Sequence, residues 1–363
     1  MTTLSAPSPA AFRARFPVLA DAVHLASCSL GPRSSALDAA MTRMLDVLRD
    51  DPTPWDFWLG QVLQARDAFA ALVNADPARV AVVPSATVGA YQVASTRNWS
   101  ARPGIVAADV EYPSVAHTWA AQQARGATVR YVPETGPFDA DECTGLVSVP
   151  LVSYRTGATL PVAEIVARAR AAGAVTFVDA YQAVGVLPVD VAALGCDFLV
   201  SGTMKYLLGL PGIAFLYARA GVIDDLEPQL TGFFGRANPL AFDPFAVDYP
   251  GDARRYQVTM PTLPAALAAT AGLGLVSELD LAAVERHVAD LARRAAGRID
   301  GVAEPAGPFL NVPDPDPMGL ARFLNQRRIF PARGTSVRLS FHWFNDESDV
   351  DAAIAAIEEW RQR

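Results

Sequence analysis

The most informative residue of the sequence is its single lysine, Lys205. The chain carries 30 basic residues, and the other 29 are arginines. Arginine can replace lysine on most surfaces, because both carry a cation on a long stem. It cannot replace a lysine that must become a neutral amine and act as a nucleophile. Lys205 is therefore a candidate for covalent chemistry, and the alternative is a leftover surface charge in a chain biased towards arginine.

A carboxylate is expected close to Lys205. The apolar run Val175–Val178 is typical of a strand and ends in Asp179, while Lys205 follows the next such run, Phe198–Val200. The carboxyl ends of parallel strands meet at one edge of a sheet, where ligands bind. Asp179 would need a cationic or hydrogen-bonding partner there, unless it caps a helix, as strand-ending aspartates commonly do. Gln182 lies three residues further along.

A third feature could bind an anion. The run Val80–Val83 is followed by Pro84–Thr87 and then by a helical pattern. Free backbone N–H groups, a hydroxyl group and the helix dipole together suit a phosphate. The alternative is an ordinary helix N-cap at Ser85 or Thr87.

An amine, an acid and an anion site are what pyridoxal phosphate requires of a protein. The aldehyde takes Lys205, the ring nitrogen takes Asp179, and Tyr112, after another predicted strand, could cover the ring, although it could equally be a core or rim tyrosine. Arg338 lies on the alternating pattern Ser336–Ser340. An inward-facing arginine there could hold a substrate carboxylate with two hydrogen bonds, and the alternative is an exposed arginine.

These residues are positioned by strands that alternate with helices, which indicates an α/β fold with a mostly parallel sheet. After Gly221 the pattern changes to a long loop, residues 233–250, and then to helices and a smaller α+β region. We predict an arm of residues 1–20, a large cofactor-binding domain of residues 21–250 and a smaller C-terminal domain of residues 251–363. The predicted strands are Val80–Val83, Ile105–Ala107, Val129–Val132, Leu146–Val152, Val175–Val178, Phe198–Val200 and Ile213–Tyr217. The predicted helices are Ser35–Arg49, Phe57–Val73, Val115–Arg125, Val162–Ala172, Ala265–Leu279, Ala282–Arg298 and a final one from about Glu347 to Arg361.

Composition excludes several other classes of protein. With 363 residues, 51% of them hydrophobic, the chain can bury a sizeable core and is not disordered. Its net charge of −8 argues against nucleic acid or an anionic membrane as a partner. No stretch is apolar for long enough to cross a membrane, and no signal peptide is expected. Three scattered cysteines fit a reducing, cytoplasmic location, and four scattered histidines without HExxH make a metal site improbable.

The sequence resembles the class V aminotransferase family of pyridoxal phosphate enzymes over nearly its whole length. The resemblance is carried by the segment from Cys196 to Ala214, in which Asp197, Gly202-Thr203, Lys205 and Gly212 follow the family's lysine signature. Met204 departs from it, because the family usually has His, Gln or Arg there. The resemblance implies a fold-type I enzyme in which Lys205 forms a Schiff base with pyridoxal 5′-phosphate.

The resemblance also implies roles for individual residues. Asp179 would pair with the ring nitrogen and Gln182 with the ring hydroxyl, and Tyr112 would stack on the ring. Members of the family are homodimers with shared sites, so Thr259 would reach the phosphate of the neighbouring subunit. Further cofactor contacts would come from Ala86, Thr87 and Ser201, and substrate contacts from Arg338, Ser29 and Tyr154.

Within the family the sequence is most similar to kynureninases. The similar segments are Ser29-Leu30-Gly31, Tyr154-Arg155-Thr156-Gly157, Lys205-Tyr206-Leu207 and Arg255-Tyr256 with Thr259 and Pro261. Gln182 and Met204 replace the usual His and Tyr, and Phe233-Phe234 replace a Trp, so the substrate is expected to differ from kynurenine. No cysteine follows Cys196, which disfavours a desulfurase that carries a persulfide in a C-terminal loop.

We therefore predict an enzyme that cleaves an α-amino acid at Cβ, as a kynureninase-like or C–S lyase reaction. Transamination and epimerisation are the alternatives within the family. A catalytically silent, ligand-binding relative is the alternative outside enzymes, and a dinucleotide oxidoreductase is disfavoured because no GxGxxG opens the first helix. Aromatic residues in Trp55–Leu59 and Phe233–Phe245 suggest an apolar or ring-bearing substrate.

Overall fold

The larger of two sheets contains seven strands. The computed structural model describes residues 6–223 and 226–363. The strand order is β2-β8-β7-β6-β5-β3-β4. The pairs from β7 through β4 are parallel, and β8 runs antiparallel to both of its neighbours, which confirms the predicted mostly parallel sheet. The bounds are β2 Val80–Val83, β3 Gly104–Ala108, β4 Thr128–Val132, β5 Thr144–Pro150, β6 Val175–Asp179, β7 Phe198–Gly202 and β8 Ala214–Ala218.

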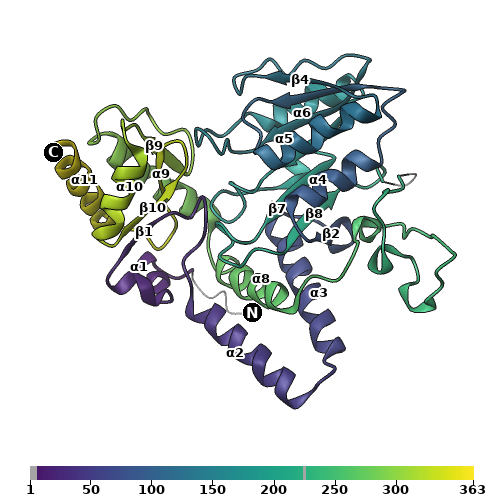
Figure 1. Cartoon of the computed structure of the whole chain (residues 1–363), viewed down its shortest axis with the longest axis horizontal. Helices are drawn as coiled ribbons and strands as arrows, with labels where there is room; N and C mark the ends of the chain where they lie inside the picture. The colour runs from purple at the N-terminus through teal and green to yellow at the C-terminus, as the bar shows by residue number, and fades with distance from the viewer. Residues whose placement is uncertain (1–5, 224–225) are drawn as a thin grey trace.

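Helices cover both faces of this sheet (Figure 1). On one face, α4 (Ala86–Ser95) and α5 (Pro113–Ala120) pack on the strands through residues such as Val93 and Trp119. On the other face lie α3 (Trp55–Leu72) and α6 (Val162–Ala171). Strands β2, β5, β7 and β8 are buried at every position. Burial on both faces explains why their sequences are continuous apolar runs rather than alternating ones.

The smaller sheet has the order β1-β10-β11-β9 and takes its first strand from the other end of the chain. β1 (Val23–Leu25) pairs in parallel with β10 (Ile329–Arg333). β11 (Val337–Ser340) lies antiparallel between β10 and β9 (Phe309–Val312). Three helices, α9 (Leu281–Ala296), α10 (Pro317–Gln326) and α11 (Glu347–Arg361), complete this α+β unit, and α1 (Pro9–Arg13) lies beside it (Figure 1). The Arg13–Asp349 ion pair links α1 to α11.

Helix α8 connects the two units. It spans Leu263–Val276, is apolar on all sides, and packs against α2 (Ser35–Asp50) and α3. A helix that is hydrophobic all round is expected to be buried. We propose the same three-part division of the chain with two changes. Strand β1 belongs to the smaller unit rather than the larger one, and helix α8 belongs to the larger unit rather than the smaller one.

Three remaining observations complete the fold. Residues 233–250 form a long loop with two short 3-10 turns, Phe233–Gly235 and Pro239–Ala241. The short helix α7 spans Val191–Leu194. Within the described ranges no single helix has the length and apolar character needed to span a membrane, although α8 and α9 pass that test as a pair bent by 83°.

Candidate active site

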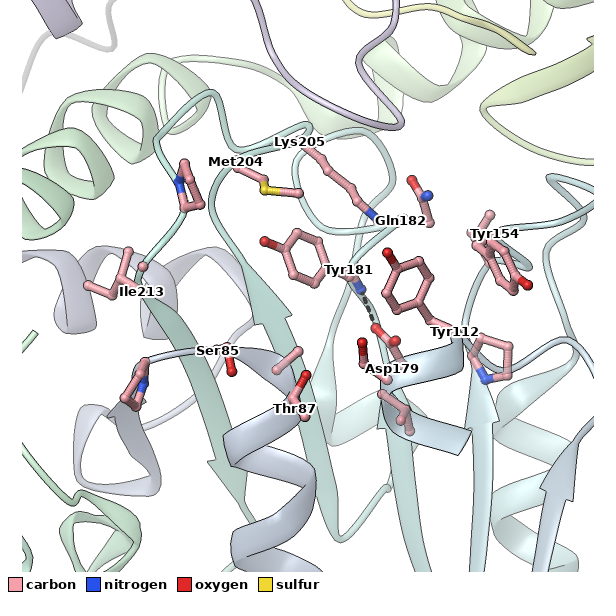
Figure 2. Close-up of a pocket in the computed structure, with 18 of the residues that line it drawn as sticks. Ser85, Thr87, Tyr112, Tyr154, Asp179, Tyr181, Gln182, Met204, Lys205 and Ile213 are labelled. Carbon is pink, nitrogen blue, oxygen red and sulfur yellow. Dashed lines mark hydrogen bonds between the residues drawn. The ribbon is translucent and has the colours of Figure 1, made fainter. Parts of the chain in front are cut away.

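The carboxyl ends of the parallel strands converge on a cavity of about 220 Å³ (Figure 2). Its walls come from the loops after β2, β3, β5, β6 and β7 and from the start of β8. We call it the inner cavity. The side chains labelled in Figure 2 line it: Ser85, Thr87, Tyr112, Tyr154, Asp179, Tyr181, Gln182, Met204, Lys205 and Ile213.

Lys205 lies in the turn after β7, and its amine reaches into the inner cavity. The residue is 8% exposed, so it is not a surface charge. Burial lowers the pKa of the amine to about 8, although the charge of Asp179 acts in the opposite direction. Nζ lies 4.5 Å from the ring centroid of Tyr181 and 5.4 Å from that of Tyr112. An amine with this pKa is partly neutral at physiological pH, as a nucleophile or base must be.

Asp179 is the last residue of β6, and it is buried. Burial raises the pKa of its carboxyl group, while Lys205 and the Tyr181 backbone amide lower it. Oδ1 accepts a hydrogen bond of 2.9 Å from the Tyr181 N–H. No helix begins at this turn, since the next one, α7, is capped by Asp190. The structure therefore excludes the alternative in which Asp179 is a helix cap.

The N-terminus of α4 opens into the same cavity. Ser85 is the N-cap, and its Oγ accepts a hydrogen bond of 3.2 Å from the Val88 N–H. The first N–H groups of a helix have no acceptor within the helix, and those of Ala86 and Thr87 stand at the cavity wall. The capping and anion-binding interpretations of this segment are thus compatible.

Gln182 and Tyr112 form the opposite wall. The Gln182 Nε2 donates a hydrogen bond of 2.9 Å to the Cys28 carbonyl oxygen. Its Oε1 is buried and has no hydrogen-bond partner among the residues that the structure describes. The ring of Tyr112 packs edge-to-face on Tyr154 at a centroid distance of 5.3 Å. A buried unpaired amide oxygen is costly, so Oε1 is an acceptor waiting for a donor such as a ring hydroxyl.

A second cavity of about 500 Å³ adjoins the first, and we call it the outer cavity. Both are lined by Tyr112, Tyr154, Gln182, Met204 and Lys205. Residues of other segments complete the outer cavity: Cys28, Ser29, Arg155, Gly334, Thr335, Ser336 and Arg338.

Arg338, on β11, lines the outer cavity and is not a free surface arginine. Its Nη1 donates a hydrogen bond of 3.1 Å to the Tyr154 carbonyl oxygen, and its Nη2 one of 3.4 Å to that of Arg333. The guanidinium carbon lies 5.7 Å from the Phe309 ring centroid. These contacts hold the guanidinium group at the mouth of the site, where the sequence predicts a carboxylate-binding arginine.

The N-terminal segment touches the lysine turn directly. The N–H of Gly31 donates a hydrogen bond of 2.8 Å to the Met204 carbonyl oxygen. A Cβ at position 31 would come within 2.8 Å of the Lys205 carbonyl oxygen, so only glycine allows this approach. The segment Ser29-Leu30-Gly31 therefore belongs to the site through its backbone as well as through Ser29.

Two predicted residues lie outside both cavities. Ser201 is fully buried, and its Oγ lies 3.4 Å from the Gly202 carbonyl oxygen. Alternate residues of a strand face opposite sides, and Ser201 faces away from α4. Thr259 is exposed and lines a separate cavity with Leu59 and Phe234. The Trp55–Leu59 and Phe233–Phe245 segments do not line the Lys205 cavities in this single chain either.

Sequence reasoning did not single out Glu111. It is buried beside Tyr112, and its Oε1 accepts a hydrogen bond of 2.5 Å from Ser148. Burial and the charge of Asp179 raise the pKa of Glu111 to about 8. At neutral pH Glu111 is therefore mostly protonated and carries little charge. The sequence signal that could have identified Glu111 is its position directly before Tyr112, a predicted ring-stacking residue.

The comparisons with known proteins now decide the family. The model of the family described as "Aminotransferase class-V" matches residues 59–308. The chain belongs to this family. This confirms the resemblance seen in the lysine segment, whereas the finer kynureninase-like assignment stays a prediction.

Proteins similar to this chain differ in their described activities. An uncharacterized aminotransferase, YcbU of Bacillus subtilis (strain 168), is 32% identical over 366 residues, which cover 96% of this chain and 97% of that protein. The isopenicillin N epimerase of Streptomyces clavuligerus is 28% identical over 347 residues, covering 84% and 87%. The solved structure of the cystine C-S lyase C-DES, in complex with its product cysteine persulfide, has a TM-score of 0.85 at 22% identity and covers 94% of this chain and 98% of that one.

The fold is therefore that of fold-type I, and the cofactor is pyridoxal 5′-phosphate. In another structure of C-DES, a lysine-to-alanine variant, glycine is covalently linked to this cofactor. The residues of the inner cavity fit it. Gln182 supplies an unpaired acceptor, Asp179 a carboxylate, α4 free backbone N–H groups and Lys205 a buried amine.

Proposed function

We propose that the chain is a pyridoxal phosphate enzyme that removes the Cα proton of an α-amino acid with Lys205 and cleaves a bond at Cβ. The observation that carries this proposal is the position of the Lys205 amine. It lines both cavities, with cofactor-binding groups in one and Arg338 in the other. Covalent contact with the cofactor and proton transfer to the substrate both need this junction.

The inner cavity would hold the cofactor. Asp179 would pair with the ring nitrogen, Gln182 with the ring hydroxyl, Tyr112 with the ring face, and Ala86 and Thr87 with the phosphate. When bound, pyridoxal phosphate supplies an aldehyde for an amine and a ring that withdraws electrons from Cα. Asp179 maintains that withdrawal by keeping the ring nitrogen protonated, and the protonated Glu111 next to it adds no competing charge.

The chain's own residues would then orient the substrate and move a proton. Arg338 would hold the substrate carboxylate with its two-pronged guanidinium group. Lys205 would hold the cofactor through its amine before the substrate binds. With the substrate in place, the Lys205 Nζ would accept the Cα proton, because a pKa near 8 leaves a fraction of the amine neutral.

Cleavage at Cβ is favoured by the hydroxyl groups that surround the outer cavity. Ser29, Tyr154 and Ser336 line it, and each can donate a proton or hydrogen bond to a departing group. The fold's similarity to a C-S lyase is compatible with this reaction. Transamination is the second candidate, because the relative with 32% identity is described as an aminotransferase. Epimerisation is the third, from the epimerase relative.

An amino-acid panel separates these reactions. We expect the cofactor-loaded protein, incubated without a keto acid, to release pyruvate, alanine or sulfide from at least one amino acid. Accumulation of the pyridoxamine form would instead identify a transaminase, and interconversion of enantiomers an epimerase. A protein that takes up no cofactor and releases no product would be a binding relative, which would overturn the proposal.

We also propose a homodimer with shared sites. Apolar side chains are exposed on α2 and α3, including Leu45 at 63% and Trp55 at 61%, and on the 233–250 loop, including Phe242 at 73% and Phe245 at 95%. α3 and this loop meet around Thr259. A surface of this kind favours pairing with a second copy, which would bring Thr259 to the neighbour's phosphate. Light scattering after gel filtration should give twice the 38.6 kDa chain mass, and Phe242→Glu should shift the population towards monomer.

A cytoplasmic location is part of the same proposal. Cys28, Cys143 and Cys196 are all free thiols, as expected in a reducing compartment. Cell fractionation of the source organism tests this directly.

A further inference from the structure

Tyr181 lies between the two predicted cofactor residues Asp179 and Gln182, yet the functions above do not use its side chain. It lines the inner cavity, and its ring lies within 4.5 Å of the Lys205 Nζ, measured to the ring centroid. Figure 2 shows its hydroxyl turned away from the Asp179 carboxylate, on the side of Met204. The phenol is thus directed away from the ring-nitrogen end of the cavity.

Gly202, at the end of β7, makes room for this phenol. A Cβ built on Gly202 would overlap the hydroxyl oxygen and the adjoining ring carbons of Tyr181. Gly202 has no positive φ that would require glycine. The space occupied by the tyrosine ring is therefore the reason for a glycine here, and the two residues act as a pair.

The phenol is neutral and has a proton to donate. Burial and the charge of Asp179 raise the pKa of Tyr181 to about 12, while a hydrogen bond with the Met204 backbone amide lowers it. Among the residues that the structure describes, the Tyr181 hydroxyl has no acceptor for its own proton. A donor without an acceptor, at the wall of a cavity, is available to a ligand.

The β7–β8 side of the cavity lacks side-chain donors of its own. It is lined by Met204, Pro211, Gly212 and Ile213, none of which carries a polar side chain. On the opposite side the Ser85 Oγ accepts a hydrogen bond from the Val88 N–H as the cap of α4, and its own proton stays available to a ligand. A phosphate at the α4 end would therefore meet backbone N–H groups, Ser85 and Thr87 on one side, and the Tyr181 hydroxyl is the side-chain donor available on the other.

We propose that Tyr181, held in place by Gly202, donates a hydrogen bond to the phosphate group of the cofactor. The inference rests on the proposed cofactor site and adds a specific donor to it. Hydrogen bonds to charged groups are stronger than those between neutral groups. Loss of the hydroxyl group should therefore weaken phosphate-dependent binding roughly 10-fold.

The test compares two ligands that differ only in the phosphate. Apo-protein is titrated with pyridoxal phosphate and with pyridoxal, and binding is followed by the visible absorbance band. We expect Tyr181→Phe to weaken pyridoxal phosphate binding about 10-fold and to change pyridoxal binding less than about two-fold. Gly202→Ala should cause the same selective loss, because it displaces the phenol. Tyr131→Phe is the matched control, since that exposed hydroxyl donates to Ala116 outside the site, and it should bind both ligands as wild type does.

Each other outcome overturns the inference in a distinct way. An equal loss for both ligands in Tyr181→Phe would mean that the phenol supports the ring or the fold rather than the phosphate. Unchanged binding of pyridoxal phosphate would mean that the hydroxyl makes no contact. If wild type itself binds no pyridoxal phosphate, the proposed function fails together with the inference. Tyr181→Phe is nearly isosteric, so it keeps the test valid if Gly202→Ala does not fold.

Discussion

The inner and outer cavities share a lysine but are built in different ways. Every wall of the inner cavity comes from the carboxyl edge of one seven-stranded sheet. The outer cavity combines Ser29 from the N-terminal segment, Tyr154 from the loop after β5 and Arg338 from the small sheet. The proposed cofactor site thus depends on one continuous core, and the proposed substrate site depends on how two units are placed against each other.

The two cavities differ in how readily their surroundings can accept changes of sequence. Relatives described as an aminotransferase, an epimerase and a C-S lyase match this chain over most of its length. A buried sheet edge tolerates few changes, because any added volume must be accommodated in a packed core. Loops from separate segments can change without disturbing the sheet. In this chain, sequence changes are therefore accommodated more easily around the outer cavity than around the inner one.

The largest expected effect comes from the residue common to both cavities. Lys205→Ala should abolish the borohydride-sensitive yellow colour of the holoprotein and reduce turnover roughly 10³-fold or more, because nucleophile and base are both lost. Absorbance spectra and product assays measure the two losses. Lys205→Arg keeps the positive charge and is the control. A yellow Lys205→Ala protein would show that the lysine does not carry the cofactor.

A substitution in the outer cavity should change the KM for the substrate rather than the affinity for the cofactor. Arg338→Met should raise the KM for an α-amino acid roughly 10- to 100-fold, since a charged hydrogen-bonded pair is removed. Cofactor affinity should stay within about two-fold of wild type. Arg333→Met, at an exposed position on the adjacent strand β10, is the matched control. Equal effects of the two substitutions would contradict a specific role for Arg338 and blur the distinction between the cavities.

The pH dependence of cofactor capture reports on the inner cavity alone. The pKa of Lys205 is lowered by burial to about 8, so its neutral fraction rises nearly tenfold per pH unit below 8 and levels off above it. The rate of colour formation by apo-protein and pyridoxal phosphate should follow that curve. Reaction of the same cofactor with a simple alkylamine corrects for its own titration. A corrected rate that keeps rising to pH 10 would indicate an ordinary, exposed amine.

The smallest expected effects come from removing one of two hydroxyl groups, those of Thr87 and Ser201, which were both predicted to contact the cofactor. Thr87→Ala should weaken pyridoxal phosphate binding roughly 5- to 10-fold, the contribution of one hydrogen bond. Ser201→Ala should leave binding within about two-fold of wild type, because Ser201 faces away from the cavity. Equilibrium titration of both variants measures the contrast, and the reverse ranking would require a different cofactor position.

The inner cavity was the predictable half of the site. Lys205, Asp179 and Thr87 follow apolar runs, and parallel strands bring their carboxyl ends together whatever the loops do. The structure places Ser201 outside both cavities. The family resemblance supplied its role without the alternation of β7, which sends Val200 and Gly202 to one face and Ser201 to the other, and counting that alternation along the strand would have indicated this position.

The outer cavity could be predicted only in part. Arg338 was found through its strand pattern, but its hydrogen bond to the Tyr154 carbonyl oxygen joins residues 184 positions apart, which no local pattern encodes. The pairing of β1 with β10 likewise joins distant parts of the chain that no local pattern connects. The sequence did not point to Tyr181, because its proposed role depends on its contact with Gly202 on the neighbouring strand β7. Thr259 still needs a second copy of the chain for its test.

The segment from Val23 to Gly31 has a practical consequence for anyone producing this protein. It supplies a strand to the small sheet, the carbonyl group that orients the Gln182 amide, and the N–H group that holds the lysine turn. Shortening the chain past this point would remove contacts on both sides of the active site at once. Partial proteolysis near the amino terminus should therefore appear first as fading colour in a preparation, well before the large core unfolds.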